Sequence, residues 1–285
     1  MKKPGAPARS RDLSGGICLP KLLFFDLDGT LFDDRGQLPA SVPPALRAAR
    51  ERDCLLFLNT GRTLCNLDPR LKILPLDGVV MGCGARIVLH DRTLRALELS
   101  AADTLRLRDL VLASGVPLVW ECDTAMYFDP QGAFHPNIAH FRSFAERNRI
   151  AREIVPGDPD FRAVKMFAFG GEAPVNALLS SFAALGFPFQ PIPRSEGWEI
   201  VPAGCSKAGG IDLLCRELSV PLSDCYAFGD SDNDLSMLTH VPHGVAMGNA
   251  PEHVRRLCAH IAPRPEEDGI ARALLDLGLI DSVSF

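Results

Sequence analysis

The sequence has no long hydrophobic run, no excess of positive charge and no closely spaced cysteine pair. None of its apolar runs reaches the ~18 residues that a membrane-spanning helix needs. The formal net charge is −5, which argues against a broad basic surface for nucleic acid. We therefore expect a soluble globular protein with neither a membrane nor a nucleic acid among its partners.

The cysteine pattern and the first residues indicate a reducing compartment. The nine cysteines include no C-x-x-C pair, so neither a zinc site nor a thioredoxin-like motif is indicated. The basic side chains near the N-terminus are not followed by the apolar segment of a signal peptide. These observations favour reduced thiols, a disordered leader over residues 1–19 and the cytoplasm as the default location.

Two catalytic or binding motifs are also missing. No G-x-S-x-G sequence is present, which argues against a serine hydrolase of the nucleophile-elbow type. The Gly-Cys-Gly sequence at residues 82–84 is followed by Ile87 where a dinucleotide-binding loop has its third glycine.

The composition and length of the chain indicate a folded protein large enough for more than one domain. The 285 residues are 47% apolar and 23% charged, which excludes a disordered protein. At about 150 residues per domain the length suggests two domains, and it also allows one large domain.

Uninterrupted apolar runs predict a parallel sheet. One such run lies within the element 21–30 and ends at Asp26, and two more are residues 54–58 and 78–81; helices are expected between them, from 41 to 53 and up to about 71. Ser41 is the expected cap of the first helix, with two prolines in its first turn. Strands without polar alternation, separated by helices, indicate a sheet covered on both faces.

The middle of the chain interrupts this pattern. Between residues 86 and 197, short hairpins mix with two or three helices, which is typical of an α+β unit. From residue 206 the parallel pattern resumes, with a helix over 207–218 and strands over 225–228 and 244–247. The predicted fold class is α/β, a Rossmann-like doubly wound parallel sheet (20–85 and 198–285) with an inserted α+β cap (86–197).

Polar residues follow the predicted parallel strands where ligands bind in such sheets. Asp-Leu-Asp-Gly-Thr at 26–30 ends the first strand, and Thr-Gly-Arg at 60–62 ends the second. Gly-Asp-Ser-Asp-Asn-Asp at 229–234 ends a later strand, and Lys207 begins a returning helix. The last acidic run lacks the spacing of a calcium EF-hand loop.

The charges of these residues suggest a metal and a phosphate. Ionised Asp26, Asp230 and Asp234 contribute −3, whereas Mg²⁺ and Lys207 contribute +3. Gathered carboxylates repel one another, and a hard cation with oxygen ligands resolves that repulsion. A metal ion and a lysine are also what a phosphoryl group requires.

On these four motifs the chain resembles the haloacid dehalogenase (HAD) superfamily of aspartate-nucleophile phosphatases, in its Cof-type branch with a class IIB cap. The resemblance extends over about residues 20–280 and includes the Gly-Val-Ala-Met-Gly-Asn-Ala sequence at 244–250 and Trp-Glu-Ile at 198–200. It implies a Mg²⁺-dependent phosphatase that acts on a small phosphorylated metabolite through an aspartyl phosphate.

The resemblance also implies a role for each motif residue. Asp26 attacks phosphorus, and Asp28 acts as general acid and base. Mg²⁺ is held by the Asp26 carboxylate, the Asp28 backbone carbonyl and Asp230, with Asp234 as a further ligand or as a support for the ligands. The remaining implied roles are phosphoryl binding by Thr60, Gly61 and Lys207, and positioning of the nucleophile region or of Lys207 by Asn233.

Several alternatives and one departure remain open. The family often has Asn-Gly-Ala where this chain has Cys-Gly-Ala at 83–85. A phosphotransferase or mutase of the same architecture, or a regulatory phosphate-binding module without turnover, is also compatible with the motifs. Four cations of the cap could reach an anionic substrate, although solvated surface charge is the simpler interpretation of each: Arg142, Arg162, Lys165 and Arg194.

Overall fold

The computed structural model describes residues 19–282. Within this range residues 19–58, 72–78 and 211–282 form one compact unit (unit 1), and residues 59–71 and 79–210 form a second (unit 2). The predicted core and cap boundaries near residues 85 and 198 stay a prediction, and residues 1–18 of the predicted leader lie outside the described residues. None of the described helices is both long and apolar enough to cross a bilayer.

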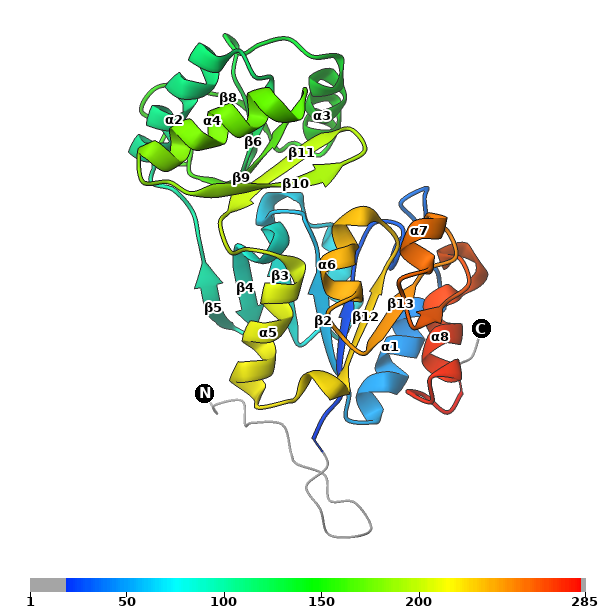
Figure 1. Cartoon of the computed structure of the whole chain (residues 1–285). Helices are drawn as coiled ribbons and strands as arrows, with labels where there is room; N and C mark the ends of the chain where they lie inside the picture. The colour runs from blue at the N-terminus through cyan, green and yellow to red at the C-terminus, as the bar shows by residue number, and fades with distance from the viewer. Residues whose placement is uncertain (1–18, 283–285) are drawn as a thin grey trace. The chain divides into compact units, whose positions relative to one another are not determined.

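Unit 1 contains parallel strands, as predicted (Figure 1). Leu22 lies opposite both Cys225 and Leu55, and all four residues of the first strand are buried. A strand buried on both faces has no polar alternation, which explains its Leu-Leu-Phe-Phe sequence. The strand order is β14 (His260–Ile261), β13 (His243–Ala246), β12 (Cys225–Gly229), β1 (Leu22–Phe25), β2 (Leu55–Asn59).

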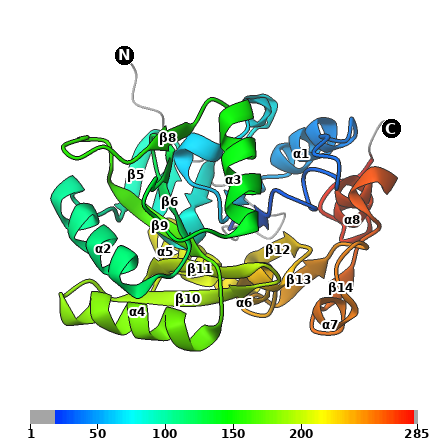
Figure 2. The ribbon, with the colours of Figure 1, turned by 90° about the horizontal axis from the view of Figure 1, so that it is seen from above.

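Helices lie on both sides of these strands (Figure 2). Helix α1 (Val42–Glu51) buries residues at spacings of three and four, which places one apolar face against the sheet: Val42, Ala45, Leu46 and Ala49. Helix α8 (Gly269–Asp276) lies on the same side as α1, and α6 (Leu235–Leu238) lies on the opposite side. Unit 1 also contains α7 (Glu252–Arg255) and most of α5 (Lys207–Leu218), whose first four residues belong to unit 2. The predicted doubly wound α/β architecture is confirmed.

Two local expectations are wrong. Ser41 precedes α1, but its backbone is helical and its side chain caps no N–H group, because Pro43 and Pro44 lack the N–H groups that a capping side chain would bind. The predicted helix before residue 71 is replaced by two 3₁₀ helices, Leu64–Asn66 and Pro69–Ile73. Pro69, the first residue of the second 3₁₀ helix, lacks the N–H group that would continue an α-helix through this segment.

Unit 2 contains β3 (Gly78–Met81), the hairpin β4 (Arg86–Leu89) and β5 (Arg92–Ala96), and a six-stranded sheet. The order of that sheet is β10 (Phe189–Arg194), β11 (Gly197–Pro202), β9 (Ala163–Ala168), β6 (Leu118–Cys122), β7 (Met126–Phe128), β8 (Ala151–Glu153). Helices α2 (Ala101–Ser114) and α4 (Glu172–Ala184) cover one face, and α3 (Pro136–Arg147) lies on the other (Figure 2). Helix α3 and strand β8 were not predicted.

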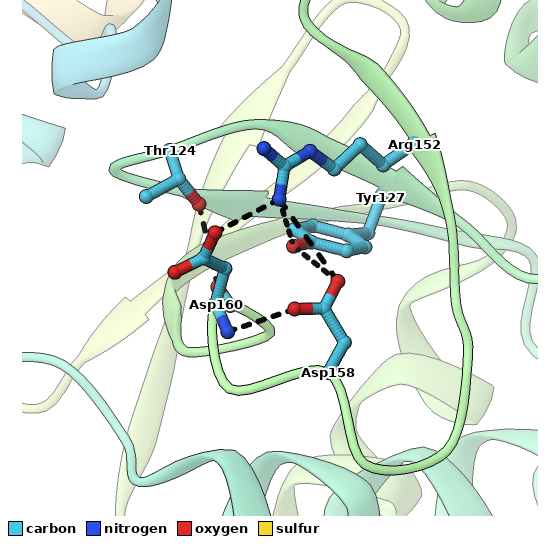
Figure 3. A network of polar contacts seen from close by, with 5 residues as sticks. All are labelled: Thr124, Tyr127, Arg152, Asp158 and Asp160. Carbon is cyan, nitrogen blue, oxygen red and sulfur yellow. Dashed lines mark hydrogen bonds and ion pairs between the residues drawn. The ribbon is translucent and has the colours of Figure 1, made fainter.

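A polar network fixes the loop between β8 and β9 (Figure 3). The Tyr127 hydroxyl donates to Asp158 (2.9 Å), and Arg152 donates to the hydroxyl (3.3 Å) and to Asp160 (2.9 Å). Burial and the bond to Asp158 raise the pKa of Tyr127 to about 12, so the phenol stays protonated at neutral pH. The network therefore ties this loop to two neighbouring strands.

Candidate active site

The first acidic loop follows β1 directly in unit 1. The Asp26 N–H donates to the Phe228 carbonyl (2.9 Å), which continues the parallel pairing to the last residue before the loop. Asp26 is 5% exposed, whereas Asp28, two residues on, is exposed. The Thr30 hydroxyl donates to Asp230 Oδ1 (3.2 Å) and joins this loop to the loop after β12.

The second acidic loop is organised around a buried carboxylate. Asp234 is 0% exposed, and its Oδ2 accepts from the backbone N–H groups of Asp230 and Ser231, both at 3.0 Å. Asn233 Oδ1 accepts from the Ser231 hydroxyl (2.6 Å), so the contact of Asn233 is local to the loop. Asp234 therefore fixes the backbone that presents Asp230.

Three of the predicted residues form one cluster. Asp26, Asp230 and Asp234 each offer a carboxylate oxygen, and these oxygens lie within 4.8 Å of one another. Three carboxylates this close repel one another unless positive charge is supplied. Hard oxygen donors of this kind fit a divalent cation such as Mg²⁺. The Asp28 carboxylate is not a member of this cluster.

Gly29 is required both by its backbone and by its surroundings. Its φ is +78°, a region that disfavours other residues. A Cβ atom at this position would lie 2.4 Å from Asp230 Oδ2. Any side chain here would therefore displace a member of the carboxylate cluster.

Gly29→Ala is expected to remove the phosphatase activity that the sequence resemblance implies and to destabilise unit 1 by about 2–4 kcal/mol, since strain at positive φ adds to a clash with Asp230. Gly36→Ala is the matched control, because Gly36 also has positive φ (+69°) but nothing lies within 4 Å of its added Cβ. Thermal unfolding and phosphate release measure both effects. Equal losses of stability and activity in the two variants would show that backbone strain alone, without the clash with Asp230, causes the effect.

The structure adds residues to which the sequence assigned no role. Asn249 Nδ2 donates to the Gly29 carbonyl (3.0 Å) and so supports the first acidic loop. The other addition in unit 1 is Thr30, through its bond to Asp230. Both belong to motifs recognised in the sequence, but the sequence does not show which atoms they contact.

The predicted phosphate-binding residues belong to unit 2. Thr60 and Lys207 are buried, at 2% and 1% exposure. The Arg62 N–H donates to Thr60 Oγ1 (3.2 Å), which leaves the hydroxyl proton of Thr60 available for another acceptor. Asn59 Nδ2 donates to the Lys207 carbonyl (3.0 Å) and fixes the start of α5.

A buried ion cluster lies on the unit 2 sheet. Lys165 Nζ lies 3.2 Å from Glu121 Oε1 and 3.3 Å from Glu199 Oε1, and all three side chains are at most 7% exposed. These residues come from the neighbouring strands β9, β6 and β11. The interpretation of Lys165 as solvated surface charge is therefore wrong, because two cross-strand carboxylates compensate its burial.

The two carboxylates of this cluster differ in pKa. Burial raises the pKa of Glu199, but Lys165 and Arg194 outweigh burial and lower it from its ordinary value near 4.5 to about 2. Burial dominates at Glu121, whose pKa is raised. Glu199 is therefore the stronger acid of the two.

The depressed pKa of Glu199 predicts an acid-sensitive contribution to stability. The ionised Glu199 carboxylate contributes about 3 kcal/mol to the free energy of unfolding. This contribution is present above about pH 4.5 and is lost as the pH falls towards 2. We expect Glu199→Gln to be less stable than wild type at roughly pH 6 and to approach it at roughly pH 3. Urea unfolding at both pH values tests this, and a stability difference that stays constant with pH would contradict it.

Comparison with known proteins agrees with these motifs. Residues 23–274 match the haloacid dehalogenase-like hydrolase family. The HMP-PP phosphatase of Serratia proteamaculans is 30% identical over 252 residues, covering 83% of this chain and 87% of the relative. The HMP-PP phosphatase of Escherichia coli is 30% identical over 250 residues, covering 85% and 89%.

A solved structure shows the same fold. A sugar phosphatase of HAD subclass IIB is 25% identical, with a TM-score of 0.73, and the match covers 91% of this chain and all of that one. The family match extends over most of the sequence and includes both acidic loops. The chain therefore belongs to the haloacid dehalogenase-like hydrolase family, and it is a phosphatase of that family.

Proposed function

We propose that this phosphatase is Mg²⁺-dependent and hydrolyses a small phosphomonoester through an aspartyl phosphate on Asp26. The observation that carries the proposal is the cluster of Asp26, Asp230 and Asp234, whose carboxylate oxygens lie within 4.8 Å of one another. Such a cluster immediately after a parallel strand is where the substrate of an α/β enzyme binds.

Mg²⁺ would be held by the carboxylates of Asp26 and Asp230 and by the backbone carbonyl of Asp28. When bound, Mg²⁺ neutralises charge on the carboxylates and on the phosphoryl oxygens. Asp234 holds the Asp230 N–H through Oδ2, so we assign it first to positioning of the Asp230 loop. Coordination by its second oxygen stays a prediction.

The reaction proceeds in two steps on residues of this chain. A carboxylate oxygen of Asp26 forms a bond to phosphorus, and the bond from phosphorus to the substrate oxygen breaks while Asp28 donates a proton to the leaving alcohol. Asp28, now ionised, takes a proton from water, which attacks phosphorus, releases inorganic phosphate and restores Asp26. The exposure of Asp28 allows such proton exchange.

Two residues of unit 2 are assigned to the phosphoryl oxygens. Lys207 supplies a positive charge, and Thr60 supplies the hydroxyl proton left free by the bond that its oxygen accepts from the Arg62 N–H. The backbone at Gly61 joins them as a third binding element. Asn233, whose contact is with Ser231, is proposed to position the loop of Asp230.

The substrate class rests on the relatives. One group is named HMP-PP phosphatase and a solved neighbour is a sugar phosphatase, so small phosphorylated metabolites are the substrates that we propose. The eight described cysteines are free thiols, which supports the cytoplasm as the place of action.

The test is phosphate release from a panel of phosphorylated metabolites, with Mg²⁺ and with a chelator. We expect release that stops with the chelator and returns when Mg²⁺ is added. Release that continues unchanged in chelator would contradict the metal assignment. Release only in the presence of an added alcohol, with transfer of phosphate to it, would identify a phosphotransferase instead.

A further inference from the structure

We propose that Glu199, on strand β11 of unit 2, is a positioning residue that holds the Thr60–Gly61 turn in its phosphate-binding conformation. Its expected effect on catalysis rests on the proposed function. Its effect on the turn itself does not, because the contacts that carry the inference all lie within unit 2.

The first observation is the close approach of Glu199 to Gly61. A Cβ atom added at Gly61 would lie 3.0 Å from Glu199 Oε1 and 3.4 Å from Oε2. Gly61 is not among the glycines with positive φ, so backbone conformation does not require glycine here. A side chain at position 61 would therefore press against the carboxylate of Glu199 and require it to move.

The second observation is a chain of hydrogen bonds through Cys83. The Cys83 thiol donates to Glu199 Oε2 (2.9 Å), and the Cys83 N–H donates to the Thr60 carbonyl (3.2 Å). Cys83 has φ +54°, a left-handed conformation that is unfavourable for a residue other than glycine or asparagine. The bond to Glu199 therefore helps to keep Cys83 in the conformation that holds Thr60.

This chain of contacts also accounts for the residue found at position 83. Asparagine, which the family often has there, tolerates the left-handed region and carries a donor. Cys83 retains the donor, and burial raises the pKa of its thiol well above the usual range, so the proton stays on sulfur. Both asparagine and cysteine at position 83 thus carry a donor for a hydrogen bond to Glu199.

Lys165 makes Glu199 suitable for this role. Glu199 Oε1 forms an ion pair with the Lys165 ammonium group, and Oε2 accepts a hydrogen bond from the Cys83 thiol. Both carboxylate oxygens therefore act as acceptors. A glutamine offers one acceptor oxygen and one donor amide, so it can satisfy only one of the two partners. Glu121 pairs with the same lysine, but within residues 19–282 it is Glu199, and not Glu121, that lies against Gly61 and accepts from Cys83.

Glu121→Gln is therefore a matched control for Glu199→Gln. Each substitution is isosteric and takes one carboxylate from Lys165, at 3.2 Å or 3.3 Å, in the same buried cluster. Hydrogen exchange of the Arg62 and Cys83 amides reports on the turn, because both donate to Thr60. We expect Glu199→Gln to accelerate that exchange at least about tenfold more than Glu121→Gln does.

The second readout is inhibition by inorganic phosphate. Glu199→Gln is expected to raise the inhibition constant roughly tenfold, and Glu121→Gln to leave it within about twofold of wild type. Cys83→Ser, which keeps a donor to Glu199, should behave like wild type, whereas Cys83→Ala should behave like Glu199→Gln.

Equal amide exchange in Glu199→Gln and Glu121→Gln would overturn the inference, whatever the two variants do to activity. An altered turn with unchanged phosphate inhibition would also overturn it, because the turn would then not govern phosphate binding. Failure of the proposed function is seen separately, as a wild-type protein that releases no phosphate from any substrate.

Discussion

Asp26→Asn is expected to lower kcat for phosphate release by at least about 10⁴-fold while leaving the fold intact. The amide is a poor nucleophile for phosphorus, and it also removes one charge from the carboxylate cluster. The change is isosteric, and the backbone N–H of residue 26 still donates to the Phe228 carbonyl. The unfolding temperature should therefore change little. Steady-state kinetics and thermal unfolding measure the two quantities.

Asp34→Asn is the control for this experiment. Asp34 lies in the same loop region, is exposed and is not part of the cluster, so the same change of charge there should leave kcat unaltered. Activity of Asp26→Asn close to that of wild type would exclude Asp26 as the nucleophile. Loss of activity together with loss of the folded state would instead indicate a structural role.

Asp28→Asn is expected to lower steady-state turnover by about 10²–10⁴-fold and to leave formation of the phosphoenzyme possible. An aryl phosphate carries a leaving group that needs no proton, so its first step can proceed without Asp28. The second step still lacks the base that activates water. We therefore expect a burst of one equivalent of phenolate followed by slow turnover.

The burst distinguishes the two carboxylates. Stopped-flow absorbance should show it in Asp28→Asn and not in Asp26→Asn. Unchanged steady-state turnover of Asp28→Asn would refute the assignment of Asp28 as acid and base. A burst in Asp26→Asn would place the phosphoryl group on another residue.

The parallel sheet was predictable because its strands are buried on both faces. A run such as Leu22–Phe25 has no polar position, and the turn residues that follow it mark where the strand ends. The carboxyl ends of parallel strands meet at one edge, which brings Asp26 and Asp230 together although they are far apart in the sequence. Both acidic residues were thus recognisable before the structure.

Helix α3 shows what local patterns leave out. Its apolar residues Ile138, Phe141 and Ala145 follow helical spacing, but the polar residues between them and the absence of a usual cap weaken the signal. His135 caps the helix through Nδ1, a role rarely played by histidine. The 3₁₀ helices at 64–73 show the opposite error, since apolar residues there predicted a helix that a proline prevents.

The ion cluster of unit 2 was not predictable from sequence. Lys165, Glu121 and Glu199 are distant in the chain and meet only because β9 lies between β6 and β11. Alternation along one strand does not reveal which residue of a neighbouring strand lies opposite. The register of the sheet decides whether such charges are buried together or exposed to water.

The most direct test of the account is to locate the phosphoryl group during turnover. Wild-type and Asp28→Asn protein are acid-quenched while they hydrolyse an aryl phosphate with Mg²⁺, and the tryptic peptide over residues 22–35 is fragmented in a mass spectrometer. The account predicts that this peptide carries one phosphoryl group on Asp26, more abundantly in Asp28→Asn. A phosphoryl group on a different residue, or rapid turnover with no phosphoryl group on this peptide in either protein, would contradict it.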